Sequence, residues 1–364
     1  MARRSRRPSA GSSPDEPTGA LVNPQPSVSV IIPARDEAGH LPESLAAVLA
    51  QDYQGPLEVC VAVGPSSDGT ETLAAQLAEA DDRVTVVANP AGTTPAALNS
   101  AIAATTGEVV VRVDGHAVLP PGYIRRAVEV LAETGADNVG GIMAAVGDTP
   151  FTEAVATAMT SRFGTGDARF HTGGPPGPVD TVYLGVFRRA ALERAGGYDE
   201  SFVRAQDAEL NHRIRITGGT VYFHPDLRVT YRPRGSVRAL ARQYFMYGRW
   251  RRVVVRRHPD SLAWRQAVPP LTLLGLLAGS AVGLSGRRIG WLAPAGYGAA
   301  VVGVSAVEGS DLDWAAHRWL PVAYVTMHLS WAAGFLTSPP RLGAVTDPLA
   351  STLPDRLLDI ERGS

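Results

Sequence analysis

Strand-like and helix-like segments alternate four times between residues 28 and 113. Short runs rich in β-branched residues take turns with segments whose apolar residues have helical spacing, in the order 28–32, 41–49, 57–63, 72–78, 84–88, 96–104 and 109–113. Such alternation is typical of βαβ units, in which the strands lie parallel and the helices pack on both faces. We therefore predict an α/β fold with a mostly parallel sheet.

The regular alternation loosens between residues 136 and 234. This region contains a Gly- and Pro-rich segment at 173–178 and strand-like runs at 179–187 and 219–223. Segments of this kind often form the second half of a ligand cleft. We expect residues 27–235 to form one α/β domain.

The fourth strand-like run ends in Asp114, Gly115 and His116. In a parallel sheet the ligand site lies at the carboxyl ends of the strands, where an acid and a second metal-capable side chain could hold a metal and a nucleotide. Asp114 and His116 are two positions apart and point to the same side of an extended chain. A solvated turn is the alternative, because Asp-Gly is common in turns.

The charge and cysteine content exclude some classes of protein. The formal net charge of −1 at pH 7 gives no reason to expect a nucleic-acid partner. All cations are Arg, and nine of them lie between residues 232 and 257, which makes residues 236–265 a basic amphipathic segment suited to an interface. The single cysteine, Cys60, excludes an intramolecular disulfide and a cysteine zinc site, and its apolar neighbours predict a core position.

The two ends of the chain have a different character. Residues 1–26 combine Arg3, Arg4, Arg6 and Arg7 with Ser, Gly and Pro, which is typical of a disordered tail, although its charge could also contact an anionic lipid surface. Residues 339–364 are interpreted as a C-terminal tail.

Residues 266–338 are predicted to form a membrane region with about three hydrophobic helices. Apolar stretches occur at 268–284, 289–307 and 319–336, and each approaches the roughly 17–25 residues that span a bilayer. The preceding Arg cluster favours a multi-pass protein of the cell membrane whose main domain is cytoplasmic. Arg287 and Arg288 leave open a re-entrant segment, and a soluble helical domain is the other alternative.

A second acidic motif lies downstream of Asp114. Asp207 and Glu209 precede a helix-like stretch that contains Arg213 and Arg215. Asp207 is a candidate general base for an acceptor hydroxyl, and a helix N-cap is the alternative role.

Five motifs, in order, resemble those of the inverting glycosyltransferases of family 2. Residues 29–37 are similar to the first nucleotide-binding strand and loop, and residues 67–70 to the second loop. Asp114-Gly115-His116 stands in the place of the DXD signature. Residues 196–200 and 206–210 resemble the family's Gly-Gly-Phe-Asp-Glu and Glu-Asp stretches. The match runs from about residue 27 to 258 and looks most like the branch of the succinoglycan-biosynthesis glycosyltransferases.

The resemblance implies a GT-A fold. It also implies transfer of a hexose from a nucleotide diphosphate sugar, with UDP as the expected nucleotide, to a lipid-linked saccharide in exopolysaccharide synthesis. It assigns the catalytic base to Asp207 and a divalent cation, Mg or Mn, to Asp114 and His116. The implied nucleotide-sugar residues are Pro33, Ala34, Arg35, Glu37, Ser67, Asp68, Asp114 and Gly115. Residues expected on the acceptor or diphosphate side are Gln206, Gln243, Arg249 and Trp250.

Three departures from the family pattern qualify this interpretation. His116 stands where a second Asp is usual, and Val63 and Gly64 replace paired acids that contact the base and ribose in relatives. Five residues separate Gln243 from Arg249, whereas processive synthases have two at this place, so single sugar additions are expected. A nucleotidyltransferase and a non-catalytic membrane scaffold are the alternative functions.

Overall fold

The computed structural model describes residues 25–343, so most of both predicted tails lies outside the described residues. An eight-stranded sheet has the order β3-β2-β1-β4-β7-β5-β8-β6, and β6 and β7 run antiparallel to their neighbours. The mostly parallel sheet predicted from the sequence is therefore confirmed. The strands are β1 Val28–Ala34, β2 Leu57–Val63, β3 Val84–Ala88, β4 Val109–Arg112, β5 Asn138–Ala145, β6 Gly177–Pro178, β7 Tyr183–Arg188 and β8 Val221–Tyr231.

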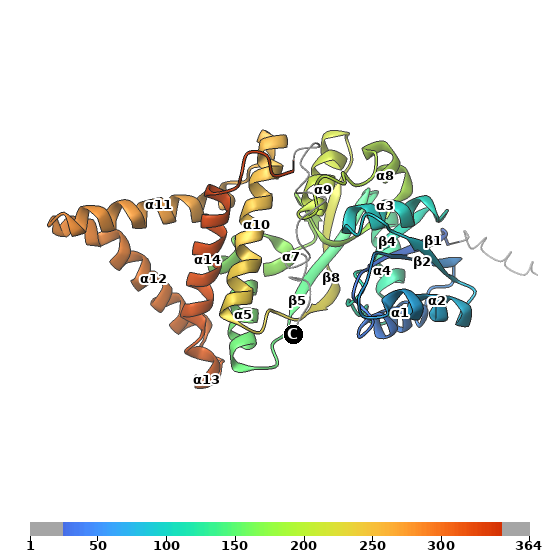
Figure 1. Ribbon diagram of the computed structural model, residues 1–364, viewed down its shortest axis with the longest axis horizontal. Helices are drawn as coiled ribbons and strands as arrows, with labels where there is room; N and C mark the ends of the chain where they lie inside the picture. The colour runs from blue at the N-terminus through green and yellow to red at the C-terminus, as the bar shows by residue number, and fades with distance from the viewer. Residues whose placement is uncertain (1–24, 344–364) are drawn as a thin grey trace, which may run out of the picture.

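Helices cover both faces of the sheet (Figure 1). Alternate residues of each strand face opposite sides, so Val30 and Ile32 of β1 pack in one core and Ile31 packs in the other. The first core includes α1 Leu41–Leu49, α2 Thr70–Ala80 and α4 Tyr123–Thr134. The second core includes α3 Thr94–Ala103, α8 Arg189–Ala195 and α9 Gln206–Ile216, and it contains the buried Cys60.

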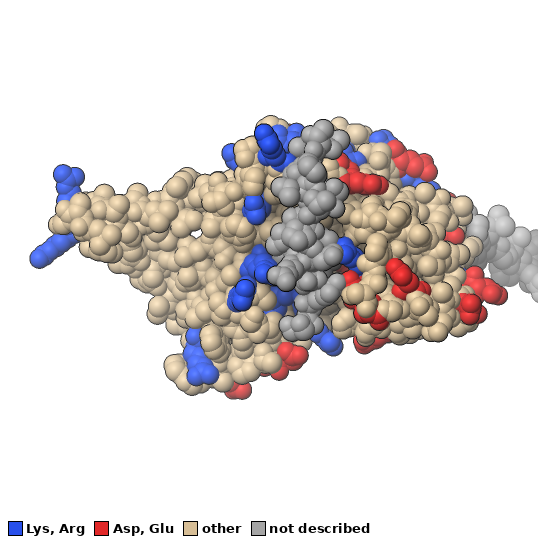
Figure 2. Space-filling view, viewed as in Figure 1, with Lys and Arg blue, Asp and Glu red and all other residues tan. Residues whose placement is uncertain are grey.

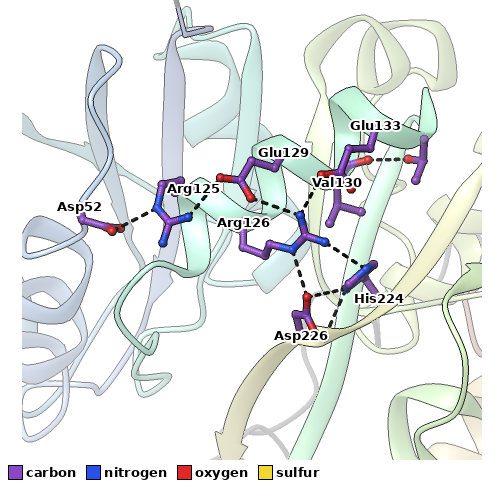
Figure 3. Close-up of polar contacts among 9 residues, drawn as sticks. Asp52, Arg125, Arg126, Glu129, Val130, Glu133, His224 and Asp226 are labelled. Carbon is purple, nitrogen blue, oxygen red and sulfur yellow. Dashed lines mark hydrogen bonds and ion pairs between the residues drawn. The ribbon is translucent and has the colours of Figure 1, made fainter.

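Ion pairs fix α4 to two other parts of the domain (Figure 3). Arg125 Nε lies 3.1 Å from Oδ2 of Asp52, which follows α1. Arg126 Nε lies 3.1 Å from Oδ2 of Asp226, and its Nη2 lies 3.3 Å from Nε2 of His224, both in β8. Because these side chains are partly exposed, the pairs orient α4 more than they stabilise it.

Beyond the sheet, α10 Val237–Arg257 and α14 Leu320–Leu336 lie side by side (Figure 1). Their backbones touch at two glycines. A Cβ on Gly248 would lie 2.0 Å from the carbonyl oxygen of Trp331, and one on Gly334 would lie 1.9 Å from that of Phe245. Only glycine permits this close crossing. The basic segment predicted at 236–265 is therefore mainly a helix packed against another helix.

Two apolar helices project from this pair as a hairpin (Figure 1). They are α11 Trp264–Leu284 and α12 Leu292–Glu308, and both are largely exposed. Among the described residues, two helices rather than the three expected are long and apolar enough to cross a membrane. The third apolar stretch forms α14, which packs against α10 and α5 Pro150–Thr160. Figure 2 shows few charges along the hairpin except at its tip, where the chain carries Arg287 and Arg288.

The elements before residue 113 agree with the sequence prediction within two residues at nearly every end. The prediction is less accurate after residue 136. The expected strand at 179–187 begins only at Tyr183, and the expected strand at 219–223 continues to Tyr231 as β8. Residues 177–178 form the short edge strand β6. Gly and Pro interrupt the strand pattern there, which explains the error.

Candidate active site

The predicted site residues gather at one edge of the sheet. The parallel strands β1, β2 and β4 end there, with Ala34 paired to Val63. Because β7 runs antiparallel to β4, its first residue, Tyr183, lies at the same edge. This edge is where ligands bind in open α/β sheets. The order of the strands places the β1 and β2 loops on one side of β4 and the end of β8 on the other.

The loops after β1 and β2 are tied together by side chains. Asp36 Oδ1 accepts hydrogen bonds from the Ser67 backbone N–H, at 2.7 Å, and from the Ser67 hydroxyl, at 2.9 Å. Asp68 Oδ2 accepts one from the Ala38 N–H at 2.9 Å. Arg35 lies next in the chain to Ala34, the end of β1, and its Nη1 donates to the Gly92 carbonyl at 3.3 Å. The two loops and the end of β1 thus form one rigid surface. It includes the predicted nucleotide contacts Pro33, Ala34, Arg35, Glu37, Ser67 and Asp68.

The loop after β4 joins this surface through His116. Its Nδ1 lies 2.8 Å from Oε1 of Glu37. Gly115 permits the approach, because a Cβ there would lie 3.0 Å from Cγ of Glu37 and 3.3 Å from the Pro33 carbonyl oxygen. The structure therefore brings the first nucleotide loop and the Asp114-Gly115-His116 motif into direct contact.

Arg112 connects the two acids on which the predicted chemistry rests. Its Nε and Nη2 donate to Oδ1 of Asp114 at 2.9 and 2.8 Å. Its Nη1 donates to Oδ1 of Asp207, the second residue of α9. The Arg112 side chain is 6% exposed, whereas those of Asp114 and Asp207 are 22% and 33% exposed. The guanidinium thus holds both carboxylates at the boundary with solvent.

The surroundings of Asp207 raise the pKa of its carboxyl group. Desolvation raises its pKa above the ordinary value; the charge of Arg112 opposes this rise and that of Asp114 adds to it. A carboxylate with a raised pKa takes a proton more readily near neutral pH. Asp207 has no capping contact, because the N-cap residue of α9 is Ala205. The helix N-cap alternative is therefore wrong.

Backbone strain also concentrates at this edge. Among the described residues, the non-glycine residues with positive φ are Asp36 at 53°, Leu184 at 45° and Ala205 at 59°. Asp36 lies in the loop after β1, and Leu184 follows Tyr183 at the start of β7. Ala205 lies two positions before Asp207. Residues other than glycine rarely adopt a positive φ, and those that do cluster at functional sites.

The donor atoms fit a divalent cation that arrives with phosphate oxygens. The described residues contain no group of three or more His, Cys, Asp or Glu that could enclose a metal by themselves. Asp114 uses Oδ1 for both hydrogen bonds from Arg112, and its Oδ2 makes no hydrogen bond within residues 25–343. Mg²⁺ and similar ions commonly bind one or two carboxylates and take their other ligands from substrate phosphates and water. Asp114 suits such a site. The chain is not extended here, although the sequence suggested that it would be: it turns after Asp114, whose carbonyl oxygen accepts from the Ala117 N–H at 2.8 Å, and Glu37 holds the His116 imidazole.

The four residues expected on the acceptor or diphosphate side occupy different environments. Gln206 begins α9 beside Asp207 and is partly exposed. Gln243 is 3% exposed, and Trp250 is 1% exposed within a core that includes Phe202 and Val254. Arg249 lies over the Phe245 ring, 5.4 Å from its centroid. Trp250 is enclosed by protein and does not offer its ring to a sugar, so the structure corrects that expectation.

Sequence reasoning gave no role to Arg112, although one signal was available. Arg112 is the only charged residue at the end of a run of three buried valines. A buried cation needs a partner, and the acid two positions later is one candidate. Its second partner, Asp207, depends on how α9 packs and could not be read from local sequence. The tyrosines at this edge, including Tyr183 and Tyr231, were missed for the same reason.

Comparison with known proteins identifies relatives of the chain. Residues 29–196 match the sequence profile of Glycosyl transferase family 2. The chain is 33% identical over 316 residues to the succinoglycan biosynthesis protein ExoA of Rhizobium meliloti, covering 84% of this chain and 93% of that protein. It is 22% identical over 246 residues to a dolichyl N-acetyl-alpha-D-glucosaminyl phosphate 3-beta-D-2,3-diacetamido-2,3-dideoxy-beta-D-glucuronosyltransferase of Methanococcus voltae, covering 65% of this chain and 76% of that protein.

A solved structure has a similar fold. It is the mannosyltransferase PcManGT from Pyrobaculum calidifontis, in complex with GDP-Man and Mn2+. The TM-score is 0.57 at 23% identity, and the match covers 87% of this chain and 88% of that one. At this identity the likeness concerns the fold.

Proposed function

The chain belongs to glycosyltransferase family 2 and has the GT-A fold, and we propose that it transfers a hexose from a nucleotide diphosphate sugar to a lipid-linked saccharide with inversion. The observation that carries this proposal is the pairing of Asp114 and Asp207 with one guanidinium, that of Arg112. A site for the donor diphosphate and a base for the acceptor then lie on adjacent sides of one reaction centre.

The donor lies along the loops after β1 and β2 in this proposal. Arg35 suits the diphosphate, because its planar group can donate two parallel hydrogen bonds. Asp68 and Ser67 hold the loop that faces the nucleoside, and UDP is the expected carrier. A divalent cation, when bound through Asp114 and His116, would neutralise charge on the departing diphosphate.

Asp207 removes the proton of the acceptor hydroxyl as that oxygen bonds to the anomeric carbon. The bond from this carbon to the diphosphate oxygen breaks in the same step, and the electron pair leaves with the diphosphate. One displacement inverts the configuration. Arg112 keeps the Asp207 carboxylate oriented, and desolvation favours its role as proton acceptor through the raised pKa.

The membrane is the proposed location of the acceptor. The hairpin of α11 and α12 is apolar and largely exposed. At 1.5 Å per residue, α11 is about 30 Å long and the segment 288–308 that ends with α12 is of similar length, close to the thickness of a bilayer core. Two crossings would leave the sheet domain and α14 on the same side, and the Arg-rich α10 favours the cytoplasmic side. The relative named for succinoglycan biosynthesis supports a role in exopolysaccharide synthesis.

A nucleotide-sugar panel tests the proposal. Detergent-solubilised protein is incubated with UDP-, GDP- and dTDP-hexoses and Mg²⁺ or Mn²⁺, and slow hydrolysis is followed by release of nucleoside diphosphate. We expect one class of nucleotide to be hydrolysed, in a cation-dependent way. Formation of pyrophosphate from a sugar phosphate and a nucleoside triphosphate would instead indicate a nucleotidyltransferase. Failure to bind any nucleotide sugar would indicate a non-catalytic scaffold.

A further inference from the structure

A cluster of tyrosines lies beyond the reaction centre, on the side away from the nucleotide loops. Tyr231 is the last residue of β8 and pairs with Ala145 at the end of β5. Tyr183 begins β7, between β4 and β5 in the sheet. Tyr247 reaches the cluster from α10. Because β7 pairs with β4, whose last residue is Arg112, Tyr183 lies beside the two-acid centre, and it packs against the same core as Tyr231. Desolvation, with the charge of Asp114, raises the pKa of Tyr183.

Gln243 fixes two of these hydroxyl groups. Its Nε2 donates one hydrogen bond to the Tyr231 hydroxyl oxygen at 2.7 Å and one to the Tyr247 hydroxyl oxygen at 3.0 Å. The side-chain amide has two N–H donors, and both are used. Each tyrosine oxygen accepts here, and among the described residues neither hydroxyl donates a hydrogen bond. Two O–H donors therefore remain available to a ligand.

The Tyr247 side chain is partly enclosed by protein and partly open to solvent. Tyr247 is 40% exposed, yet desolvation raises its pKa. Tyr231 raises that pKa further, and the charges of Arg234 and Arg204 oppose the rise. Arg234 follows Tyr231 by three positions, and Arg204 precedes Asp207 by three. Hydroxyl donors and guanidinium groups on one partly enclosed surface suit a phosphate oxygen.

We propose that Tyr231 and Tyr247, oriented by Gln243 and flanked by Arg204 and Arg234, bind the phosphate or diphosphate of the lipid-linked acceptor. This inference rests on the proposed function. Two features favour the acceptor over the donor as the source of the phosphate. The end of β8 lies on the opposite side of β4 from β1 and β2. In addition, Tyr247 belongs to α10, which packs against α14 beside the apolar hairpin (Figure 1).

Gln243 is a positioning residue in this arrangement, and one substitution can change it from a hydrogen-bond donor to an acceptor. Gln243→Glu keeps the shape of the side chain but replaces its N–H donors with a carboxylate. Both tyrosines would then donate to residue 243, and their protons would no longer face the ligand. The added negative charge would also repel phosphate. A purely structural role for Gln243 would not predict a selective loss of phosphate binding.

The test uses the full-length protein in detergent micelles with farnesyl diphosphate as the lipid probe and farnesol as its uncharged control. Binding of nucleoside diphosphate with Mn²⁺ is measured on the same samples by titration calorimetry. We expect Tyr231→Phe, Tyr247→Phe, Arg204→Gln, Arg234→Gln and Gln243→Glu each to weaken farnesyl diphosphate binding about tenfold, the loss of one hydrogen bond to a charged group. Nucleotide affinity should remain unchanged.

Matched controls come from the same helix. The Tyr244 ring lies 5.6 Å from that of Tyr247, but Tyr244 is buried and its hydroxyl makes no hydrogen bond to any described residue, so Tyr244→Phe should bind like the wild type. Arg242→Gln, at an exposed position, is the control for the two arginine variants. Unchanged farnesyl diphosphate binding in the five variants would overturn the inference. Weakened nucleotide binding with unchanged lipid binding would assign the cluster to the donor diphosphate and overturn it as well.

Measurements on the wild-type protein distinguish failure of the phosphate site from failure of the proposed function. If it binds nucleoside diphosphate but not farnesyl diphosphate, the phosphate site is refuted and the proposed function stands. If it neither binds nor hydrolyses any nucleotide sugar, the proposed function is refuted, and with it the acceptor site that rests on it.

Discussion

Arg112, the last residue of β4, donates a hydrogen bond to the carboxylate of Asp207, 95 positions further along the chain. The same guanidinium holds Asp114, so the residue proposed to hold the divalent ion and the residue proposed as base share one cation. Replacement of Arg112 should therefore damage both halves of the reaction.

Arg112→Gln removes that shared cation, so the carboxylates of Asp114 and Asp207 lose their common ion-pair partner. Loss of a hydrogen bond to a charged group costs about 1.5–3 kcal/mol, so we expect turnover to fall roughly 10–150-fold. The measurement is the initial rate of nucleotide-sugar hydrolysis. Arg125→Gln is the control, because the ion pairs that this residue makes in the described part of the chain are with Asp52 and Glu129, and the variant should leave the rate unchanged. Equal rates in both variants would contradict the role of Arg112.

The pH profile of the reaction should show the raised pKa of Asp207. The base works as a carboxylate, so the rate falls as the pH drops through a pKa above the ordinary value for Asp. Arg112 opposes the rise, so Arg112→Gln should move the acid limb to higher pH. Asp114 adds to the rise, so Asp114→Asn should move it to lower pH. Shifts in the same direction for both variants would refute this electrostatic account.

Ala205 should store strain next to the base. A non-glycine residue with a φ of 59° is disfavoured by about 1–2 kcal/mol, so Ala205→Gly is expected to raise the free energy of unfolding by about 1 kcal/mol. Ala208→Gly is the control. Ala208 lies inside α9, where glycine costs about 0.5–1 kcal/mol. Chemical denaturation measures both, and destabilisation by Ala205→Gly would rule out the strain.

The contact between α10 and α14 should depend on its two glycines. Gly248→Ala and Gly334→Ala force a Cβ against backbone atoms, and overpacking of this kind costs about 1–3 kcal/mol. Gly296→Ala, in α12, meets nothing within 4 Å and should not destabilise the fold. Thermal unfolding in detergent compares the three variants. A Gly248→Ala protein as stable as the Gly296→Ala protein would show that the helices do not cross so closely.

The hairpin should anchor the protein in a bilayer. Leu274 and Leu277 of α11 are 49% and 59% exposed, and an Arg at the centre of a membrane helix costs about 2.5–3.5 kcal/mol. We expect the double variant Leu274→Arg, Leu277→Arg to lose co-flotation with liposomes. Val86→Arg, at an exposed position of β3, is the control and should float like the wild type. Full flotation of the double variant would place membrane contact elsewhere.

The sequence predicted the first half of the sheet well because its signals are local. Each strand before residue 113 is a short β-branched run bounded by turn residues, and Asp114 lies two positions after the end of the last of them. The later strands depend on distant pairing. β8 extends to Tyr231 because it pairs with β5, and no local pattern marks that end.

The residues of the site that lie in local motifs were also predicted, and those that depend on packing were not. Motifs identified Asp114 and Asp207 one at a time, whereas their common partner Arg112 appears only after α9 packs against the sheet. Gln243 was assigned to the acceptor or diphosphate side, but it is buried and acts on Tyr231 and Tyr247. The packing of α14 against α10 also explains why three apolar stretches give two exposed apolar helices.

Asp207→Asn tests the central claim most directly, because it keeps the shape of the side chain and removes the base. Nucleotide-sugar hydrolysis and binding of nucleoside diphosphate with Mn²⁺ are measured on the same preparation, with Asp226→Asn, a surface acid paired to Arg126, as the control. We predict unchanged nucleotide affinity and a rate that falls about 10²–10⁴-fold. Undiminished turnover in Asp207→Asn would contradict the account.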